Sequence, residues 1–259
     1  MFSKISIGIK TFLRDEQLFN TIHAIQDNLP SAKMIIADCG DCTEEKDGIY
    51  ADIARDGHHT IQLPFDAGFG AMSNAIVDVL DRPYLLIGSD DFDFSTEDVR
   101  QGVELLQAVL DDYPYIDIAS GRVNNNPYEF ELLDDGHTVT EIPLDFIDKH
   151  RIQYLRYVRC DLTVNYSLMH EDVFDKVRWD SDVKIGQGEH GAFFVDCKRA
   201  GLKTVYVPNA NVNEQPVRNT ARYNEYRNRA RSPERTCFVK RGIKKYVLGN
   251  GIIDYQEKQ

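Results

Sequence analysis

Arg82-Pro83-Tyr84-Leu85-Leu86-Ile87-Gly88-Ser89-Asp90-Asp91-Phe92-Asp93-Phe94 is the stretch in which a short apolar run meets three carboxylates. The run from Tyr84 to Ile87 has no polar alternation, which is typical of a strand covered on both faces of a mainly parallel sheet. Ligands of open α/β sheets bind beyond the carboxyl ends of such strands. The segment therefore predicts a buried strand that delivers Asp90, Asp91 and Asp93 to a site.

The three carboxylates can be interpreted in two ways. Crowded carboxylates repel one another unless a cation holds them, and hard oxygen ligands suit Mg²⁺ or Mn²⁺ that bridges to a diphosphate. The alternative is a solvated acidic turn, which is common among exposed loops. The sequence on either side has to decide between these interpretations.

Two further strands are predicted before this segment. Residues 4–9 alternate apolar and polar side chains and end at Lys10-Thr11-Phe12-Leu13-Arg14, and a helix closed by Pro30 follows. Residues 32–38 form a second apolar run that ends on Asp38. Because the carboxyl ends of parallel strands meet at one edge, Asp38 is expected beside the acidic cluster.

A glycine-bearing loop leads into the helix that precedes the Tyr84 strand. It reads Phe65-Asp66-Ala67-Gly68-Phe69-Gly70, and the helix continues past Asn74 to Leu80. Small residues let the backbone approach a ligand closely. The resulting βαβ repeat predicts three loop ends at one edge of the sheet.

The second half of the chain has a weaker pattern. We expect a strand over 116–119, a hairpin excursion within 121–150, strand structure in 154–166, a helix over 192–200 and a strand over 204–208. A Gly-rich turn presents Glu189 and His190 just before that last helix. These two side chains are candidates for base chemistry. A capping Glu beside an incidental His is the structural alternative.

The length and composition of the chain limit the classes of protein to which it can belong. The 259 residues, 42% of them apolar, suffice for one large domain with a small appendage. The sequence has no apolar run long enough for a membrane span and no secretory signal, and its five scattered cysteines are typical of reduced thiols, so we predict a cytoplasmic protein. Cys39-Gly40-Asp41-Cys42 is formally a CxxC without a second metal-ligating pair.

Charge is distributed unevenly along the chain. The net charge is −12, yet residues 215–259 carry 11 Lys or Arg against 4 acidic residues. An acidic body does not attract nucleic acid in general, but a basic tail can hold the phosphates of a sugar nucleotide, a lipid or DNA. We predict a domain over 1–215, divided at residue 120 into a nucleotide half and an acceptor half, with a basic helical tail over 216–259 that packs on or closes over the site.

Taken in order, these motifs resemble the nucleotide-sugar glycosyltransferases of family 2, which have the GT-A fold. The resemblance covers about residues 4–215. It implies an α/β fold with a Rossmann-like, mostly parallel central sheet flanked by helices and a small antiparallel part on the acceptor side. The residues that it places at the nucleotide sugar are Lys10, Thr11, Arg14, Asp38, Asp66, Gly68, Asn74, Ser89 and Asp90, with Asp38 against the uracil ring.

The resemblance also assigns metal and acceptor residues. Ser89-Asp90-Asp91 occupies the metal-binding DxD, so Asp91 is the best ligand for Mn²⁺ or Mg²⁺. Asp93 belongs to the same acidic loop, and Glu214 stands where the family often places a His ligand. Glu189 and His190 occupy the acceptor-site motif; we favour Glu189 as the base. Trp179 and Gly188 are assigned to the acceptor.

Patchy further likeness, including Thr11-Phe12-Leu13-Arg14, points to the β-1,4-N-acetylgalactosaminyltransferase branch. The implied activity is inverting transfer from a UDP-sugar to a hydroxyl group of a saccharide or a lipid-linked saccharide. Tail arginines would close over the diphosphate, unless they form only a solvated helix face; they are Arg222, Arg227, Arg229 and Arg231.

Three alternatives stay open on sequence grounds. The first is a viral or phage enzyme that glycosylates hydroxymethylated bases in DNA, with the basic tail against the strand. The second is an inactive nucleotide-sugar-binding module, because Ser89 and His190 depart from the family pattern. The third, a dinucleotide enzyme, is disfavoured because no GxGxxG follows the first strand.

Overall fold

The computed structural model describes residues 2–124, 129–144, 155–185, 189–216, 218–229, 237–248 and 251–255, with the side chain of Glu189 excepted. Gly188, Arg231 and part of the predicted hairpin excursion lie outside the described residues. No described helix is long and apolar enough to cross a membrane.

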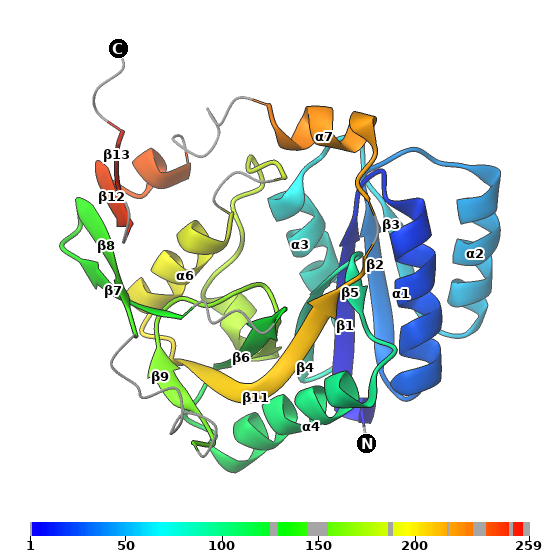
Figure 1. Cartoon of the computed structure of the whole chain (residues 1–259), viewed down its shortest axis with the longest axis horizontal. Coiled ribbons are helices and arrows are strands. Elements are labelled where there is room, and N and C mark those ends of the chain that lie inside the picture. Colours follow the sequence, from blue (N-terminus) through cyan, green and yellow to red (C-terminus); the bar gives the residue numbers. More distant parts are fainter. Residues whose placement is uncertain are drawn as a thin grey trace.

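A nine-stranded sheet forms the centre of the molecule, and Figure 1 shows it curling between helices. Its order is β3-β2-β1-β4-β10-β6-β11-β5, with β9 paired to β11. Strands β3, β2, β1 and β4 run parallel, whereas β10 is antiparallel to both of its neighbours. The strands are β1 (Ile5–Thr11), β2 (Lys33–Asp38), β3 (His59–Gln62), β4 (Tyr84–Ser89), β5 (Phe92–Asp93), β6 (Ile118–Val123), β9 (Val158–Cys160), β10 (Ser167–His170) and β11 (Thr204–Glu214).

Helices cover both faces of this sheet. One apolar layer joins Ile5, Ile7 and Ile9 of β1 to α1, α2 and α4, while the other joins β2 and β4 to α3 and α6. Burial on both faces accounts for the uninterrupted apolar runs of the strands. The helices are α1 (Asp15–Asn28), α2 (Glu44–Arg55), α3 (Phe69–Asp78), α4 (Glu97–Asp112), α6 (Glu189–Arg199) and α7 (Ala221–Arg227), with short 3₁₀ turns at Phe2–Lys4 and Glu171–Asp175.

The predicted α/β architecture is confirmed. Residues Tyr84 to Ile87 are buried in β4, which pairs in parallel with β1 and brings the acidic loop to the carboxyl edge of the sheet. The sequence analysis missed β10, the antiparallel strand between β4 and β6. This strand has only four residues, which is too short for periodicity to distinguish it from a loop.

A second sheet involves the tail, which differs from the helical prediction. Its order is β13-β12-β8-β7, from β7 (Phe130–Asp134), β8 (Thr138–Pro143), β12 (Lys245–Leu248) and β13 (Gly251–Asp254). Of the described tail, α7 and a turn from residue 237 are helical. The β-branched and aromatic residues of β12 form strand structure because β8 offers a paired edge.

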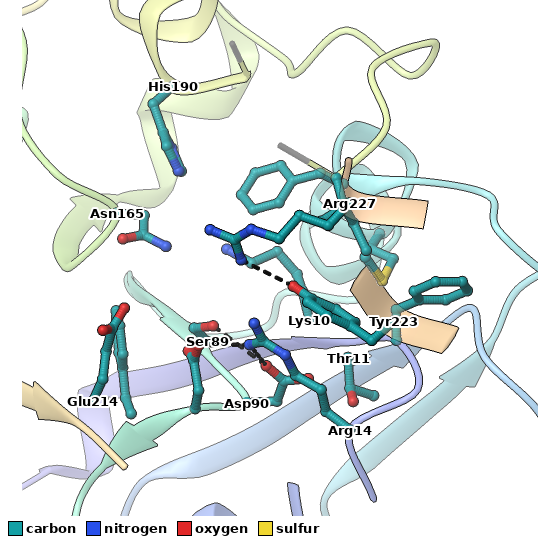
Figure 2. A pocket seen from close by; sticks show the side chains of 16 residues that line it. Lys10, Thr11, Arg14, Ser89, Asp90, Asn165, His190, Glu214, Tyr223 and Arg227 are labelled. Atoms are coloured by element: carbon teal, nitrogen blue, oxygen red, sulfur yellow. Dashed lines mark hydrogen bonds and ion pairs between the residues drawn. The ribbon is translucent and has the colours of Figure 1, made fainter. Parts of the chain in front are cut away.

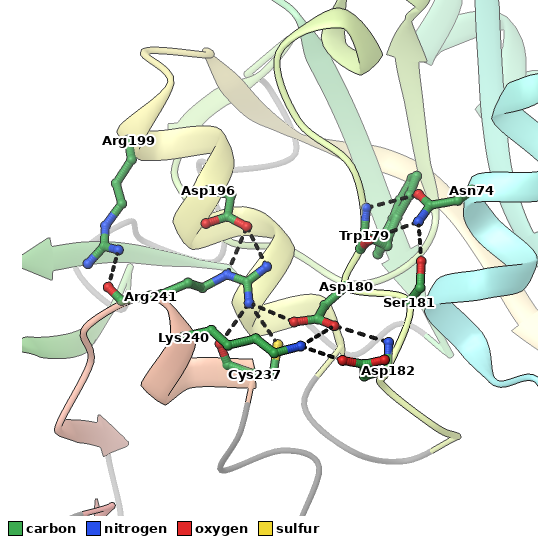
Figure 3. Close-up of polar contacts among 10 residues, drawn as sticks. All are labelled: Asn74, Trp179, Asp180, Ser181, Asp182, Asp196, Arg199, Cys237, Lys240 and Arg241. Atoms are coloured by element: carbon green, nitrogen blue, oxygen red, sulfur yellow. Dashed lines mark hydrogen bonds and ion pairs between the residues drawn. The ribbon is translucent and has the colours of Figure 1, made fainter.

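Ion pairs of Lys240 and Arg241 attach this part of the tail to the body, as Figure 3 shows. The guanidinium of Arg241 donates to Asp196 of α6 at 2.6 and 2.8 Å and lies 3.3 Å from a carboxylate oxygen of Asp180. Its side chain is largely buried. The tail is therefore a structural part of the fold.

Gly70 of α3 packs tightly against the loop that follows Trp179. A Cβ atom at Gly70 would lie 1.9 Å from the carbonyl oxygen of Asp180, a backbone atom that cannot move aside alone. In contrast, Gly48 is exposed in α2, and a Cβ there would meet nothing within 4 Å.

We predict opposite effects of alanine at these two glycines. Gly70→Ala should lower the free energy of unfolding by about 1–3 kcal/mol because it overpacks a rigid contact. Gly48→Ala should raise it by about 0.5–1 kcal/mol because alanine is the better helix former. Urea denaturation of both variants measures the difference, and equal effects would contradict the packing described here.

Candidate functional site

A cavity of about 290 Å³ lies at the carboxyl ends of β1 and β4. Figure 2 shows its labelled side chains pointing toward one another from both halves of the chain. The predicted residues that line it are Lys10, Thr11, Arg14, Ser89, Asp90, Asp91, His190 and Glu214. The sheet edge that the sequence indicated is thus where these chemistry-bearing groups meet.

Arg14 joins the two carboxylates that follow β4. Its Nη1 donates to Asp90 Oδ1 at 3.0 Å and to Asp91 Oδ2 at 2.5 Å. The side chains of Arg14 and Asp90 are 6% and 5% exposed, and Asp91 is 20% exposed. Burial alone disfavours the charge on Arg14, but the two carboxylates outweigh it and raise the pKa of the guanidinium. Arg14 is therefore a permanently charged cation at the floor of the cavity.

Asp90 is held by its surroundings on two sides. Burial raises the pKa of Asp90 to about 6, although Arg14 opposes this shift. The backbone carbonyl of Asp90 accepts a hydrogen bond from Thr21 of α1 at 2.9 Å. The acidic loop is consequently anchored to α1 through both main chain and side chain.

The predicted metal ligands do not form a metal site as they lie. Asp91 pairs with Arg14, Asp93 accepts hydrogen bonds from Ser95, and Glu214 accepts one from Asn124 at 2.9 Å. In the part of the chain that the structure describes, no three His, Cys, Asp or Glu side chains converge as a cation site. This set of donors fits a guanidinium, and Mn²⁺ or Mg²⁺ binding stays a prediction from the resemblance.

Asp38, the predicted uracil contact, is buried and fully engaged. One carboxylate oxygen accepts from the amide of Gly40 at 2.7 Å, and the other from Tyr50 at 2.7 Å and Lys46 at 2.9 Å. Lys46 also pairs with Asp15 at 2.7 Å. Burial disfavours the Lys46 charge, but these carboxylates raise the pKa of the ammonium. The uracil contact remains a prediction, and the observed role of Asp38 is to join β2 to α2.

Helix α7 lies near the carboxyl ends of the parallel strands, as Figure 1 shows, and its Tyr223 and Arg227 line the cavity. Tyr223 stacks on Arg14, with the guanidinium carbon 4.1 Å from the ring centre, and Tyr226 packs edge-on against Phe12 at 5.2 Å. Arg229, just beyond α7, makes a two-nitrogen ion pair with Asp66. The Asp66 carboxylate, which was predicted to contact the nucleotide, is thus paired with a tail arginine.

Of the three predicted tail arginines that the structure describes, Arg227 alone lines the cavity. Arg222 pairs with Asp41, Arg229 pairs with Asp66, and Arg231 lies outside the described residues. Arg227 is exposed and donates to the Tyr223 hydroxyl at 3.2 Å. It is the tail residue placed to meet a bound anion.

Other predicted residues have structural roles here. Asn74 bonds to both backbone groups of Trp179, at 2.9 and 3.1 Å, and to Ser181 (Figure 3). Trp179 is buried and stacks on Phe193 with ring centres 4.1 Å apart. Gly68 has φ 102° and packs against the backbone of residues 183 and 184. The structure does not bring these three residues into the cavity, so their ligand contacts stay predictions.

The candidate bases lie at the start of α6. His190 lines the cavity, and its ring packs edge-on against Phe69 at 5.2 Å between centres. Glu189 begins the helix, but its side chain lies outside the described residues, as does Gly188. The position of His190 places a proton-accepting group at the wall opposite the acidic loop.

Among the polar lining residues, Asn165 and Tyr223 were not predicted from the sequence. Asn165 precedes β10, the strand that periodicity did not reveal. Tyr223 belongs to a tail whose position depends on tertiary contacts. Neither carries a local motif that could have identified it.

We predict that the buried Lys46 network is worth far more than a surface ion pair. Lys46→Met should lower the free energy of unfolding by about 3–5 kcal/mol because it leaves buried Asp38 uncompensated. Lys4→Met removes an exposed pair with Asp111 and should cost less than about 1 kcal/mol. Chemical denaturation of both variants tests this, and equal losses would refute the role of the network.

The sequence of this chain is similar to those of known transferases. No family model matches the chain. It is 28% identical over 200 residues to mouse beta-1,4 N-acetylgalactosaminyltransferase 2, covering 74% of this chain and 36% of the relative. It is 33% identical over 119 residues to human beta-1,4 N-acetylgalactosaminyltransferase 1, covering 46% of this chain and 20% of the relative. The chain thus spans about a third or less of these relatives.

Solved structures share its fold. GalNAc-T7 with UDP, GalNAc and Mn²⁺ superposes with a TM-score of 0.67 at 13% identity, covering 92% of this chain and 47% of that one. Residues 1–349 of TarS from S. aureus, in complex with UDP-GlcNAc, superpose with a TM-score of 0.62 at 10% identity, covering 92% and 65%. The resemblance drawn from sequence motifs is therefore confirmed at the level of fold and of relatedness to β-1,4-GalNAc-transferases.

Proposed function

We propose that this chain, which has the GT-A fold of glycosyltransferases, transfers a sugar from a UDP-sugar to a hydroxyl group. The observation that carries the proposal is the cavity at the carboxyl ends of β1 and β4, where the cations Lys10, Arg14 and Arg227 lie among the carboxylates Asp90, Asp91 and Glu214. A diphosphate is the ligand that such a cluster at a sheet edge suits. The related sequences and the solved neighbours that contain UDP support the UDP-sugar as donor.

The proposed reaction is an inverting displacement. The acceptor oxygen forms a bond to the anomeric carbon while the bond from that carbon to the diphosphate oxygen breaks. UDP leaves with the bonding electron pair, and the acceptor proton passes to a base. Charged donors aimed at the diphosphate stabilise the negative charge that develops on the leaving group.

His190 and Glu189 are the two candidates for the base. His190 lines the cavity across from the acidic loop, which supports its assignment. Glu189, the base favoured on sequence grounds, is one residue away at the same helix start, and we retain it as the alternative. An imidazole or a carboxylate within hydrogen-bonding reach of the acceptor can take its proton.

We propose a saccharide or a lipid-linked saccharide as the acceptor and an N-acetylhexosamine as the transferred sugar. The names of the related transferases and the UDP-GlcNAc bound to TarS support this choice. Hydroxymethylated DNA is the competing acceptor, since basic residues concentrate in the tail. Transfer assays with labelled UDP-sugars against both acceptor classes distinguish the two.

The donor proposal predicts selective nucleotide binding. Isothermal titration with UDP, GDP and TDP should show UDP binding at least about tenfold more tightly than GDP, because a site shaped for a pyrimidine leaves a purine poorly paired. TDP, which differs by a methyl group and a hydroxyl group, reports how closely the base and ribose are read. Absence of binding to all three would refute the donor site and favour an inactive module.

Variants at the start of α6 identify the base. If His190 is the base, His190→Ala should lower kcat by about 10²–10⁴-fold while UDP affinity changes little, because general-base catalysis acts on the acceptor. Glu189→Gln serves as the matched variant and should retain most turnover. Loss of turnover in Glu189→Gln with normal activity in His190→Ala would assign the role to Glu189.

A further inference from the structure

The position between the two carboxylates after β4 is already filled by a side chain. Arg14 Nη1 contacts Asp90 and Asp91 together, at 3.0 and 2.5 Å. A guanidinium there supplies the positive charge that would otherwise have to come from a bound ion. Because Arg14 stays protonated at any ordinary pH, this charge is a fixed feature of the site.

The neighbouring groups are poor complements to a metal. Ser89 offers a neutral hydroxyl where a carboxylate would be the stronger ligand, and it lies 3.4 Å from Asp90 Oδ1. Glu214 on β11 accepts a hydrogen bond from Asn124, whose side-chain oxygen in turn accepts from the Glu214 amide at 2.8 Å. Arg14 occupies Asp91 Oδ2, so a divalent ion that bound through this oxygen would have to displace the guanidinium.

Arg14 also has capacity to bind an anion. The side chain of Arg14 is only 6% exposed, and its Nε makes no hydrogen bond with any described residue. This Nε is enclosed, so an anion in the cavity would meet the part of the Arg14 guanidinium that lines the cavity, and phosphate oxygens are strong acceptors for guanidinium groups. Stacking on Tyr223 at 4.1 Å fixes the guanidinium plane while Arg14 lines the cavity.

Two more cationic side chains, Lys10 and Arg227, line the cavity with Arg14. Lys10, at the end of β1, lies with its ammonium 4.2 Å from the centre of the Phe69 ring, and Arg227 reaches in from α7. Figure 2 shows the ends of Lys10, Arg14 and Arg227 pointing into the same space. Three elements from opposite ends of the chain therefore present positive charge to one ligand.

Resting on the function proposed above, we infer that Arg14, together with Lys10 and Arg227, holds the diphosphate of the sugar nucleotide, so that nucleoside diphosphate binding at this site needs no divalent metal. Arg14 thereby does two things. It offsets the charge of the buried Asp90 and of its neighbour Asp91, and it lines the cavity in which the phosphate oxygens would lie.

Calorimetric titration with UDP tests this inference, with each protein measured once in EDTA and once in Mn²⁺. The wild-type protein should bind UDP in EDTA with a Kd within about threefold of that in Mn²⁺. Arg14→Gln should weaken UDP binding in EDTA by about ten- to a hundredfold, the loss expected for charge-assisted hydrogen bonds. Arg100→Gln removes a surface ion pair on α4 and should bind UDP as the wild type does.

The wild-type measurements decide the question even if Arg14→Gln does not fold. UDP binding that appears only with Mn²⁺ would overturn the inference while leaving the proposed function in place. Unchanged affinity of a folded Arg14→Gln in EDTA would overturn it as well. No UDP binding by the wild-type protein in either buffer would overturn the proposed function and this inference together.

Discussion

The contact of Arg14 with Asp90 and Asp91 is the interaction on which the rest of the site depends. Of the two carboxylates that follow the buried strand β4, Asp90 is buried and Asp91 is partly exposed. Bringing two like charges into such a place requires an opposite charge with good geometry. Arg14 meets that requirement from the loop after β1, the strand that pairs with β4. Strand pairing and charge pairing thus position the same groups.

Residues of the C-terminal tail pack against the same Arg14 side chain and against other parts of the body. Tyr223 of α7 covers the guanidinium of Arg14, and Arg229 pairs with Asp66 beside it. Further along, Arg241 joins Asp196 of α6, and β12 pairs with β8. The tail closes one side of the cavity and completes a second sheet, so the site is built from both ends of the chain. A basic tail on an acidic body is explained here by the carboxylates that it contacts.

Some residues that were predicted to contact the nucleotide form hydrogen bonds to neighbouring structural elements instead. Asp38 is engaged by Lys46, Tyr50 and the amide of Gly40, and Asn74 holds the backbone of Trp179. Side chains at the carboxyl edge of a sheet can therefore position the loops that surround a ligand. Such residues set the shape of the cavity even where they do not face it.

The sequence alone was sufficient to predict the parallel core and the sheet edge at which the cavity lies. Uninterrupted apolar runs such as Tyr84 to Ile87 can be satisfied only by burial on both faces, and each run ended in polar residues at one edge. Tertiary structure alone decided how the charges are paired, because Arg14 and Asp91 are 77 residues apart. It also decided the position of Tyr223, the strands of the tail and β10, since four-residue strands and long-range ion pairs leave no local periodicity.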